Sequence, residues 1–191
     1  MTMQNTSKKI AIIGCSGSGK STLATQLGEI LRLNVVHLDA HFWHPGWVPT
    51  PDEEWIEITE KLMAQESWIM DGNFSGTMDM RLNAAGTIIF MDFPRTICLW
   101  RIIKRRFQNF GKSRPDVGPG CPERFLGWAF IELLNGIWNY PKKQRPVIVE
   151  KLRTYADGRH IITLSSPVNV TRFLEDARRS GVLDAWYQNA V

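Results

Sequence analysis

The sequence lacks the features that mark secreted, metal-stapled and membrane-spanning proteins. Its three cysteines, Cys15, Cys98 and Cys121, are odd in number and far apart, so they predict neither a disulfide framework nor a CxxC metal or redox site. The apolar run at residues 10–13 is far too short for a signal peptide, and no run approaches the ~20 apolar residues of a membrane-spanning helix. We therefore expect a cytoplasmic protein with no membrane partner.

A low-complexity or collagen-like composition is also absent. Fifteen glycines and ten prolines are ordinary for 191 residues, and 43% of the residues are hydrophobic, as in a folded globular chain. The length predicts a single domain over residues 1–191. The formal net charge is only +4, yet residues 1–94 carry a net −5 and residues 95–159 a net +9. Such clustering predicts an anion-binding region within residues 95–159.

Short apolar runs alternate with longer amphipathic segments along the chain. The apolar runs predict strands over residues 9–13, 35–38, 68–71, 87–91 and 160–164. The segments between them predict helices over residues 20–32, 51–62, 94–110, 123–139 and 146–157, and from 167 onward. Thr50 is expected to cap the second helix, with Pro51 at its first position. Alternating strands and helices predict an α/β fold with a parallel sheet.

Residues 14–21 form a complete G-x-x-x-x-G-K-[ST] motif between the first predicted strand and the first predicted helix. Glycines let successive backbone N–H groups turn toward phosphate oxygens, and the helix N-terminus adds further donors. Lys20 is expected to bring its charge to the β- and γ-phosphates, and the Ser21 hydroxyl to ligate Mg²⁺. A chance glycine-rich turn is the weaker alternative. The predicted nucleoside triphosphate site comprises Gly14, Ser16, Gly17, Ser18, Gly19, Lys20, Ser21 and Thr22.

Three aspartates follow predicted strands, where ligands bind in open α/β sheets. Asp71 precedes Gly72 and is expected to hold Mg²⁺ through water, whereas Asp92 serves equally well as a turn former or helix cap. Asp39 begins the segment 39–47, which contains two tryptophans, a phenylalanine and two histidines. These rings suit a pocket that stacks on a planar acceptor.

Three histidines at i, i+4 and i+7 spacing, His37, His41 and His44, would suit a metal site only on one continuous helix. His37 lies in a predicted strand and His44 precedes Pro45, so no single helix presents all three. We therefore predict no metal site from these histidines, and the only metal ligands expected are Ser21 and Asp71.

A basic cluster occupies residues 95–114, which contain seven Lys and Arg residues and no acidic residue. Arg101 and Arg105 are four residues apart on one predicted helix and therefore share a face. A solvated helix face is the alternative, but like charges repel unless an anion lies among them. Arginine also binds phosphate bidentately and stabilises a transferring phosphoryl group. The cluster therefore favours a polyphosphate site.

In order and spacing these motifs resemble the adenylate-kinase-like nucleotide kinases. They are more closely similar to the bacterial proteins named DNA topology modulation protein, FlaR-related. The similarity runs from the P-loop to about Tyr155. It rests on residues 37–43, 45–47, 71–73, 103–106, 114–116 and 120–123.

The resemblance implies a three-layer P-loop fold whose five-stranded parallel sheet has the order 2-3-1-4-5, with a small lid at residues 111–123. It also implies that Arg101 and Arg105, at the base of the lid, contact the nucleotide and its phosphates. The lid contains one cysteine, which excludes a four-ligand zinc lid. Arg81 is a possible substitute for the acceptor-binding arginine that those kinases carry after Asp-Gly. The expected acceptor site comprises Asp39, Phe42, Trp43, Asn73, Arg81 and Arg114.

These observations predict an ATP- and Mg²⁺-dependent phosphotransferase of the nucleotide or nucleoside kinase type, with Lys20, Asp39, Arg101 and Arg105 as catalytic residues. The acceptor stays open. A hydroxyl acceptor needs a base, for which Asp39 is suited; a monophosphate needs an arginine clamp; water would make the protein a slow ATPase.

The alternative is an ATP-binding regulator of DNA topology whose basic helix meets the phosphate backbone. No helix-turn-helix or zinc motif supports it, so direct nucleic-acid binding is not favoured but stays open, as does the oligomeric state.

Overall fold

A computed structural model describes residues 8–123, 127–181, 183 and 186 of the protein. Its centre is a five-stranded parallel sheet with the order β2-β5-β1-β6-β7. Counted along the chain, these strands have the predicted order 2-3-1-4-5, so the predicted sheet is confirmed. The strands are β1 (Lys9–Gly14), β2 (Val35–His37), β5 (Trp68–Asp71), β6 (Thr87–Met91) and β7 (His160–Leu164).

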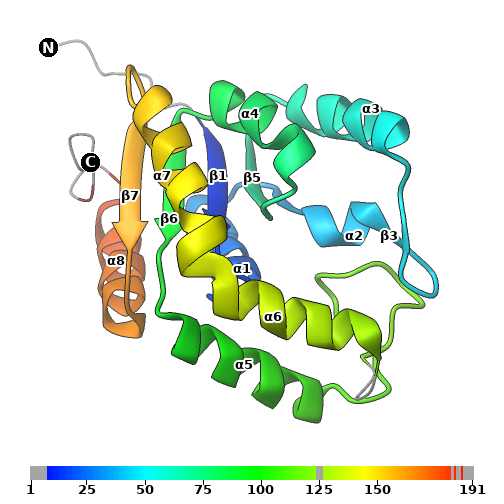
Figure 1. Ribbon diagram of the computed structural model, residues 1–191. Coiled ribbons are helices and arrows are strands. Elements are labelled where there is room, and N and C mark those ends of the chain that lie inside the picture. The colour runs from blue at the N-terminus through cyan, green and yellow to red at the C-terminus, as the bar shows by residue number, and fades with distance from the viewer. Residues whose placement is uncertain (1–7, 124–126, 182, 184–185, 187–191) are drawn as a thin grey trace, which may run out of the picture.

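The central strands are buried on both faces, which is why they read as continuous apolar runs rather than alternating ones. Ile12 of β1 pairs in register with Asp71 of β5 on one side and with Ile89 of β6 on the other. Because all five strands are parallel, their carboxyl ends meet at one edge of the sheet, where the arrows point in Figure 1. The loops that follow the strands therefore gather at this edge.

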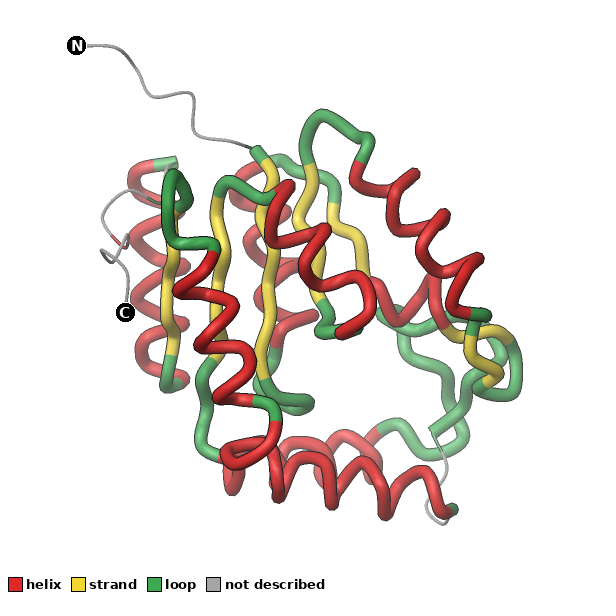
Figure 2. Tube along the Cα trace, turned by 45° about the horizontal axis from the view of Figure 1, so that its top comes forward, coloured by secondary structure: helices red, strands yellow, loops and turns green. Residues whose placement is uncertain are grey.

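Helices cover both faces of the sheet and complete a three-layer α/β fold. Figures 1 and 2 show α1 (Lys20–Leu31) and α8 (Pro167–Ser180) on one face, and α4 (Ser75–Ala84) and α7 (Arg145–Thr154) on the other. A further helix, α3 (Asp52–Met63), packs against α4. Beyond the carboxyl ends of the strands, α5 (Arg95–Gln108) and α6 (Trp128–Lys143) lie side by side.

Four elements were not predicted from the sequence. They are α2 (Leu38–Phe42), the antiparallel hairpin of β3 (Trp43–His44) and β4 (Val48–Pro49), and α4. The two-residue strands are too short to show a periodic pattern. α4 contains Gly76 and follows Phe74, whose φ of 34° is left-handed, so neither helix propensity nor a cap residue marks its start.

Several helix ends also differ from the predictions. The prediction that Thr50 caps the second helix is wrong: α3 begins at Asp52 with Pro51 at its N-cap, and the Thr50 hydroxyl donates instead to the Phe42 carbonyl at 2.6 Å. The helix expected at residues 123–139 begins at Trp128, although residues 124–126 lie outside the described ranges. No helix in those ranges is long and apolar enough to cross a lipid bilayer.

Candidate active site

A cavity of about 1440 Å³ lies at the carboxyl edge of the sheet. The structure brings most of the predicted site residues into its lining, from the loop between β1 and α1, from α1, α2, β3, β5 and α5, and from the segment 111–123. These residues are Ser16, Gly17, Ser18, Gly19, Lys20, Ser21, Thr22, Asp39, Trp43, Asp71, Arg101, Arg105 and Arg114. Four predicted residues do not line the cavity, namely Gly14, Phe42, Asn73 and Arg81.

The P-loop between β1 and α1 has the backbone geometry of an anion-binding loop. Gly17 has a φ of 83° and Gly19 a φ of 101°, which side chains with a Cβ rarely adopt. A Cβ at Gly17 would also lie 2.4 Å from the carbonyl oxygen of Cys98. Asn73 supports this loop from outside the cavity, because its side-chain oxygen accepts the backbone N–H of Gly14 at 3.0 Å. Asn73 therefore holds the loop in shape, contrary to its predicted place in the acceptor site.

Lys20 extends along the P-loop, where its Nζ donates to the carbonyl oxygens of Gly14 at 2.9 Å and Cys15 at 3.0 Å. Burial lowers the pKa of Lys20, and the charges of Asp71 and Asp39 act in the opposite direction. These two carboxylates therefore favour the charged ammonium that a phosphate needs. The amine lies in the wall of the same cavity as both of them.

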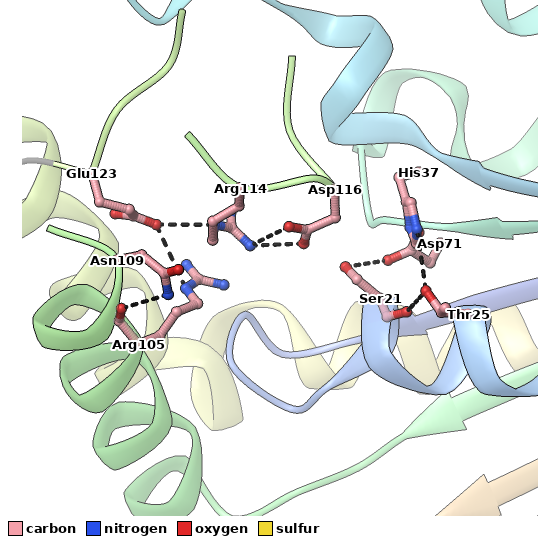
Figure 3. Close-up of polar contacts among 9 residues, drawn as sticks. All are labelled: Ser21, Thr25, His37, Asp71, Arg105, Asn109, Arg114, Asp116 and Glu123. Carbon is pink, nitrogen blue, oxygen red and sulfur yellow. Dashed lines mark hydrogen bonds and ion pairs between the residues drawn. The ribbon is translucent and has the colours of Figure 1, made fainter. Parts of the chain in front are cut away.

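Asp71 lies at the end of β5 and is hydrogen-bonded through both carboxylate oxygens (Figure 3). The Ser21 hydroxyl donates to Oδ2 at 2.7 Å, and His37 Nδ1 lies 2.6 Å from Oδ1. His37 Nε2 lies 3.4 Å from the Thr25 hydroxyl oxygen, so His37 bridges β5 and α1. The hydrogen bond that His37 donates to Asp71 raises the pKa of His37, against the effect of its burial.

The Ser21–Asp71 pair fits a Mg²⁺ ion. A hydroxyl and a carboxylate, both hard oxygen ligands, lie within hydrogen-bond distance of each other beside the phosphate-binding loop. Within the described part of the chain no group of three or more His, Cys, Asp or Glu side chains is arranged as a metal site. Such a set is not required, because Mg²⁺ is commonly bound by one or two protein oxygens together with waters and phosphates.

Asp39 lies in α2, half-buried in the cavity wall. Burial raises the pKa of its carboxyl, and the charges of Lys20 and, more weakly, Arg114 lower it. Among the residues that the structure describes, no hydrogen bond or ion pair occupies this carboxylate. Asp39 is therefore an available carboxylate whose proton affinity is raised by its surroundings.

The aromatic residues near Asp39 divide between the cavity and the core. Trp43 and Trp47 line the cavity, with ring centroids 5.6 Å apart at an interplanar angle of 68°. Phe42 instead packs against the rings of Trp55 and Phe74, with centroids 5.1 and 4.7 Å away. The expectation that Phe42 contacts the acceptor is therefore not supported by its position, since its ring belongs to the cluster behind the cavity wall.

Four arginines of the basic cluster line the cavity, and a buried glutamate organises three of them. Glu123 is only 2% exposed, and Arg105 Nε and Arg114 Nε lie 3.6 and 3.1 Å from its carboxylate oxygens (Figure 3). Arg106 Nη2 lies 3.1 Å from the same carboxylate. Arg114 also donates to both oxygens of Asp116, at 2.9 and 2.7 Å. The positive charges of these three arginines, which predicted a phosphate site, thus point into the protein toward Glu123.

Arg101 approaches the P-loop from α5. Its Nη1 donates to the carbonyl oxygen of Ser18 at 2.6 Å, and its guanidinium lies 5.0 Å from the ring centroid of Phe93. A Cβ added at Gly19 would lie 3.3 Å from the same Nη1. Arg101 is thus in contact with the loop that would hold the phosphates, and its contact with the nucleotide stays a prediction.

Arg81 has a structural role, and its position outside the cavity lining does not support its predicted contact with the acceptor. The side chain is fully buried in α4. Its guanidinium donates to the carbonyl oxygens of Gly72 at 2.9 Å, of Asn73, and of Phe74 at 3.2 Å. Because these bonds fix the turn that follows β5, the guanidinium is not free to bind a ligand.

The segment 111–123, predicted as a lid, returns to its own start and rests on the β3–β4 hairpin. Gly111 N donates to the Glu123 carbonyl at 3.0 Å, which closes the segment at its base. At its far side, Gly46 N donates to the Gly120 carbonyl at 2.8 Å and Trp47 Nε1 donates to the Pro122 carbonyl at 3.0 Å. The hairpin that follows Asp39 and this segment therefore form one wall of the cavity. That the segment acts as a lid stays a prediction.

Comparison with known proteins identifies a relative in sequence. Over 130 residues the chain is 33% identical to the Bacillus subtilis (strain 168) protein named Uncharacterized protein YqaC. The match covers 65% of this chain and 72% of that protein. The chain belongs to the YqaC family. No family model matches the sequence.

In structure, this YqaC-family chain is similar to a shikimate kinase. The shikimate kinase from Acinetobacter baumannii in complex with shikimate matches with a TM-score of 0.54, over 92% of this chain and 93% of that chain, at 14% identity. A gluconokinase from Sinorhizobium meliloti 1021 matches at a TM-score of 0.47 and 16% identity, over 94% of this chain and all of that chain, too weakly to carry an argument. At such identities the likeness concerns the fold, and it confirms the predicted P-loop α/β fold. The resemblance to the DNA topology modulation proteins stays a prediction.

Two members of the site were missed by reasoning from the sequence alone. His37 was assigned only to a strand, although its register partner in β5 is Asp71. Glu123 was taken as the start of a helix and the end of the predicted lid, with no role in the site, although it is an acidic residue close after seven basic ones. For His37 the signal was its place one residue before the end of a predicted strand beside the Asp71 strand. For Glu123 it was the unbalanced charge of residues 95–114.

Proposed function

We propose that this protein is an ATP- and Mg²⁺-dependent phosphotransferase that moves the γ-phosphoryl group to a hydroxyl group of a small acceptor. The observation that carries the proposal is the position of Asp39. Its carboxylate lines the same cavity as Lys20 and the Ser21–Asp71 pair, and within the described residues it has no hydrogen-bond partner. A donor site and an available base therefore face one another across one space.

The P-loop supports the assignment of ATP as donor. Its backbone N–H groups and Lys20 suit the phosphates, and Ser21 with Asp71 would hold Mg²⁺. When bound there, Mg²⁺ would supply positive charge that neutralises the phosphate oxygens. Arg101, in contact with the Ser18 carbonyl, and Arg105, at the cavity wall, add charge from the opposite side. Positioning and charge neutralisation by these residues account for most of the expected catalysis.

The arginines favour a hydroxyl acceptor over a monophosphate. A monophosphate needs a free arginine clamp. Arg81 donates to three backbone carbonyls, and Arg114 is engaged by Asp116 and Glu123. A hydroxyl acceptor instead needs a base to accept its proton as the new O–P bond forms, and Asp39 suits that role. The aromatic wall of Trp43 and Trp47 suits an acceptor with an apolar or planar face.

The predicted DNA-binding alternative gains no support from the arginines. Arg105, Arg106 and Arg114, the residues that a phosphate backbone would meet, converge on Glu123 inside the protein. A DNA-binding surface needs outward-facing, uncompensated basic side chains. We therefore do not propose direct nucleic-acid binding, and the experiment described next includes DNA binding as a result that would reject the proposal.

The test uses a panel of acceptors with γ-labelled ATP and Mg²⁺: nucleosides, sugars, polyols, hydroxy acids and nucleoside monophosphates. We expect label on a hydroxyl compound, no transfer by Lys20→Ala, and a loss of about 10²- to 10⁴-fold in Asp39→Asn, which removes the base. Lys61→Ala is the matched control, because Lys61 is an exposed lysine of α3. Label on monophosphates alone, release of free phosphate alone, or DNA binding with a steep salt dependence and no transfer would each reject the proposal.

A further inference from the structure

The helices α5 and α6 expose a large amount of apolar surface. Seven large hydrophobic side chains on this part of the chain are between 36% and 73% exposed. They are Trp100, Ile103 and Phe107 of α5, Phe110 shortly after it, and Trp128, Ile131 and Trp138 of α6. The other large hydrophobic side chains that are exposed in the described part of the chain occur singly, on β4, α3, α7 and α8. Single exposed residues are normal, whereas such a group marks an interaction site.

The two helices form one antiparallel pair. The guanidinium of Arg95, in the first turn of α5, lies 3.9 Å from the ring centroid of Trp138, near the end of α6. At the opposite ends of the helices, the guanidinium of Arg106 lies 3.9 Å from the ring centroid of Phe130. Arg95 also donates to the carbonyl oxygen of Trp138 at 3.0 Å. Contacts at both ends therefore hold the pair together.

The exposed residues of α5 lie on a side of the helix that faces away from the cavity. Arg101 and Arg105 line the cavity and define its inner side. Trp100, Ile103 and Phe107 follow the spacing i, i+3 and i+7, so they share one side of the helix. None of these three residues lines the cavity. The helix is thus polar toward the cavity and apolar on its outer side.

The exposed residues of α6 extend this surface. Leu133 lines the cavity, whereas Ile131 and Trp138, seven residues apart, share another side of the helix. Trp138 adjoins α5 through its contact with Arg95. In Figures 1 and 2 no other helix or strand of the described chain lies beyond this pair on the side away from the sheet. We refer to the seven exposed residues together as the outer face; among them, Trp128 also borders the cavity.

The area of the outer face is typical of an interface rather than of a free surface. An aromatic side chain has about 150–250 Å² of surface, so the exposed fractions of the seven residues amount to roughly 800 Å². The largest apolar patch on a typical monomer is about 300–600 Å². A stable protein–protein interface buries about 800 Å² from each partner. Two copies of the outer face therefore supply the area that a stable dimer needs.

The charges near the outer face favour a second copy of the chain over an anionic membrane. Four of the seven basic residues at 95–114 are engaged with groups inside the protein. The exposed cations are Lys104 at the cavity, Lys112 beyond one end of the pair, and Lys142 and Lys143 at the other end. Docking to an anionic membrane typically uses a cluster of about four to eight Lys and Arg residues, which these separated lysines do not form. An apolar centre with charges at its rim is instead the composition of a homodimer interface.

We propose that the outer face is the interface of a homodimer, in which the α5–α6 pairs of two copies pack against each other about a two-fold axis. An apolar face is complementary to itself, as a two-fold interface requires. Trp100 of α5 and Ile131 of α6 become buried on association, and the lysines at the ends of the pair stay in water. The inner sides of both helices continue to line the cavity of their own copy. The proposal does not depend on the proposed function.

The experiment measures the mass of the full-length protein by sedimentation velocity and light scattering. The concentrations span about 0.1–100 µM, because interfaces of this size have dissociation constants of micromolar or below. We expect twice the mass of one chain at the upper concentrations. Trp100→Glu and Ile131→Glu, one on each helix, are each expected to raise the dimer dissociation constant about 100-fold or more, since a carboxylate would be buried in an apolar interface.

The matched control is Val168→Glu, which places the same charge at an exposed apolar residue of α8. This variant is expected to form the dimer as the wild type does. Because all three replaced residues are exposed, circular dichroism and thermal unfolding of the monomer should show that each variant is folded. The two interface variants lie on different helices, so one of them still tests the interface if the other fails to fold.

Several results would overturn the proposal. A wild type that stays monomeric at the highest concentration has no such interface, and a dimer that persists in either folded interface variant uses another surface. Equal weakening by Val168→Glu would assign the effect to added charge in general. Flotation with vesicles of phosphatidylcholine and phosphatidylserine is the further test: a monomer that binds these vesicles would make the outer face a membrane-docking surface. None of these measurements needs a nucleotide or an acceptor, so failure of the proposed phosphotransfer leaves their outcome unchanged.

Discussion

His37 Nδ1 lies 2.6 Å from Oδ1 of Asp71, while Oδ2 of the same carboxylate accepts the Ser21 hydroxyl at 2.7 Å. The carboxylate that suits Mg²⁺ is thus oriented by a residue of the neighbouring strand, which is itself in reach of Thr25. Partners of metal ligands orient the ligand and tune its affinity, although they do not touch the metal. His37 is therefore expected to act as a positioning residue.

Replacing His37 tests this role. In His37→Ala we expect the Mg²⁺ concentration for half-maximal activity to rise about 10- to 100-fold, because Asp71 loses the contact that orients it. His37→Asn keeps a donor near the Nδ1 position and is expected to recover part of the loss. The measurement is the Mg²⁺ titration of phosphotransfer, with His41→Ala as a control for a nearby exposed histidine. A lower kcat with an unchanged Mg²⁺ requirement would contradict the role.

The raised pKa of Asp39 predicts that the rate of phosphotransfer depends on pH. Burial raises the pKa of its carboxyl, and a general base works only when ionised. The rate should therefore rise with pH through that raised pKa and be lost as the pH falls below it, with a midpoint above the ordinary aspartate value of 3.8. The profile of kcat/KM against pH measures this midpoint. Asp39→Asn should abolish this limb, whereas Asp79→Asn, on the outer side of α4, should retain it.

Removing the charge of Glu123 is expected to lower the stability of the protein strongly. Glu123→Gln keeps the shape of the side chain but removes the charge that faces Arg105, Arg106 and Arg114. Because an uncompensated buried charge is costly, we expect a loss of about 3 kcal/mol in the free energy of unfolding. Urea unfolding measures this loss. The control is Glu150→Gln, which breaks an exposed ion pair with Arg153 and should change the free energy by about 0.5 kcal/mol or less.

Replacing Arg81 is expected to lower the stability of the protein without weakening acceptor binding. Arg81→Lys cannot reproduce three guanidinium hydrogen bonds to Gly72, Asn73 and Phe74, so we expect it to lower the free energy of unfolding by about 2 kcal/mol. The KM for the acceptor should be unchanged within about twofold. If Arg81→Lys is fully folded and its KM for the acceptor is raised tenfold or more, Arg81 contacts the acceptor after all. Arg153→Lys, at an exposed position, is the control for the substitution itself.

Local pattern alone predicted the strands and the phosphate-binding loop, and the order of the strands came from the family resemblance. The P-loop is one continuous stretch between a strand and a helix, and its glycines meet a backbone requirement that the sequence shows directly. The five apolar runs predicted the strands because a parallel sheet buries them on both faces. The carboxyl-end rule then led to Asp39 and Asp71 without any knowledge of their neighbours.

The tertiary structure decided which side chains are free to act. Arg81 and Arg114 are the same residue type in the sequence. Arg81 nevertheless donates to backbone carbonyls, whereas Arg114 lines the cavity between two carboxylates. Likewise, His37 gained a role only from its register beside Asp71. Hydrogen bonds and ion pairs form between residues far apart in the chain, so a pattern read along one segment does not reveal them. The sequence thus determined the fold and the phosphate-binding loop, and the packing of distant segments decided which charges that loop faces.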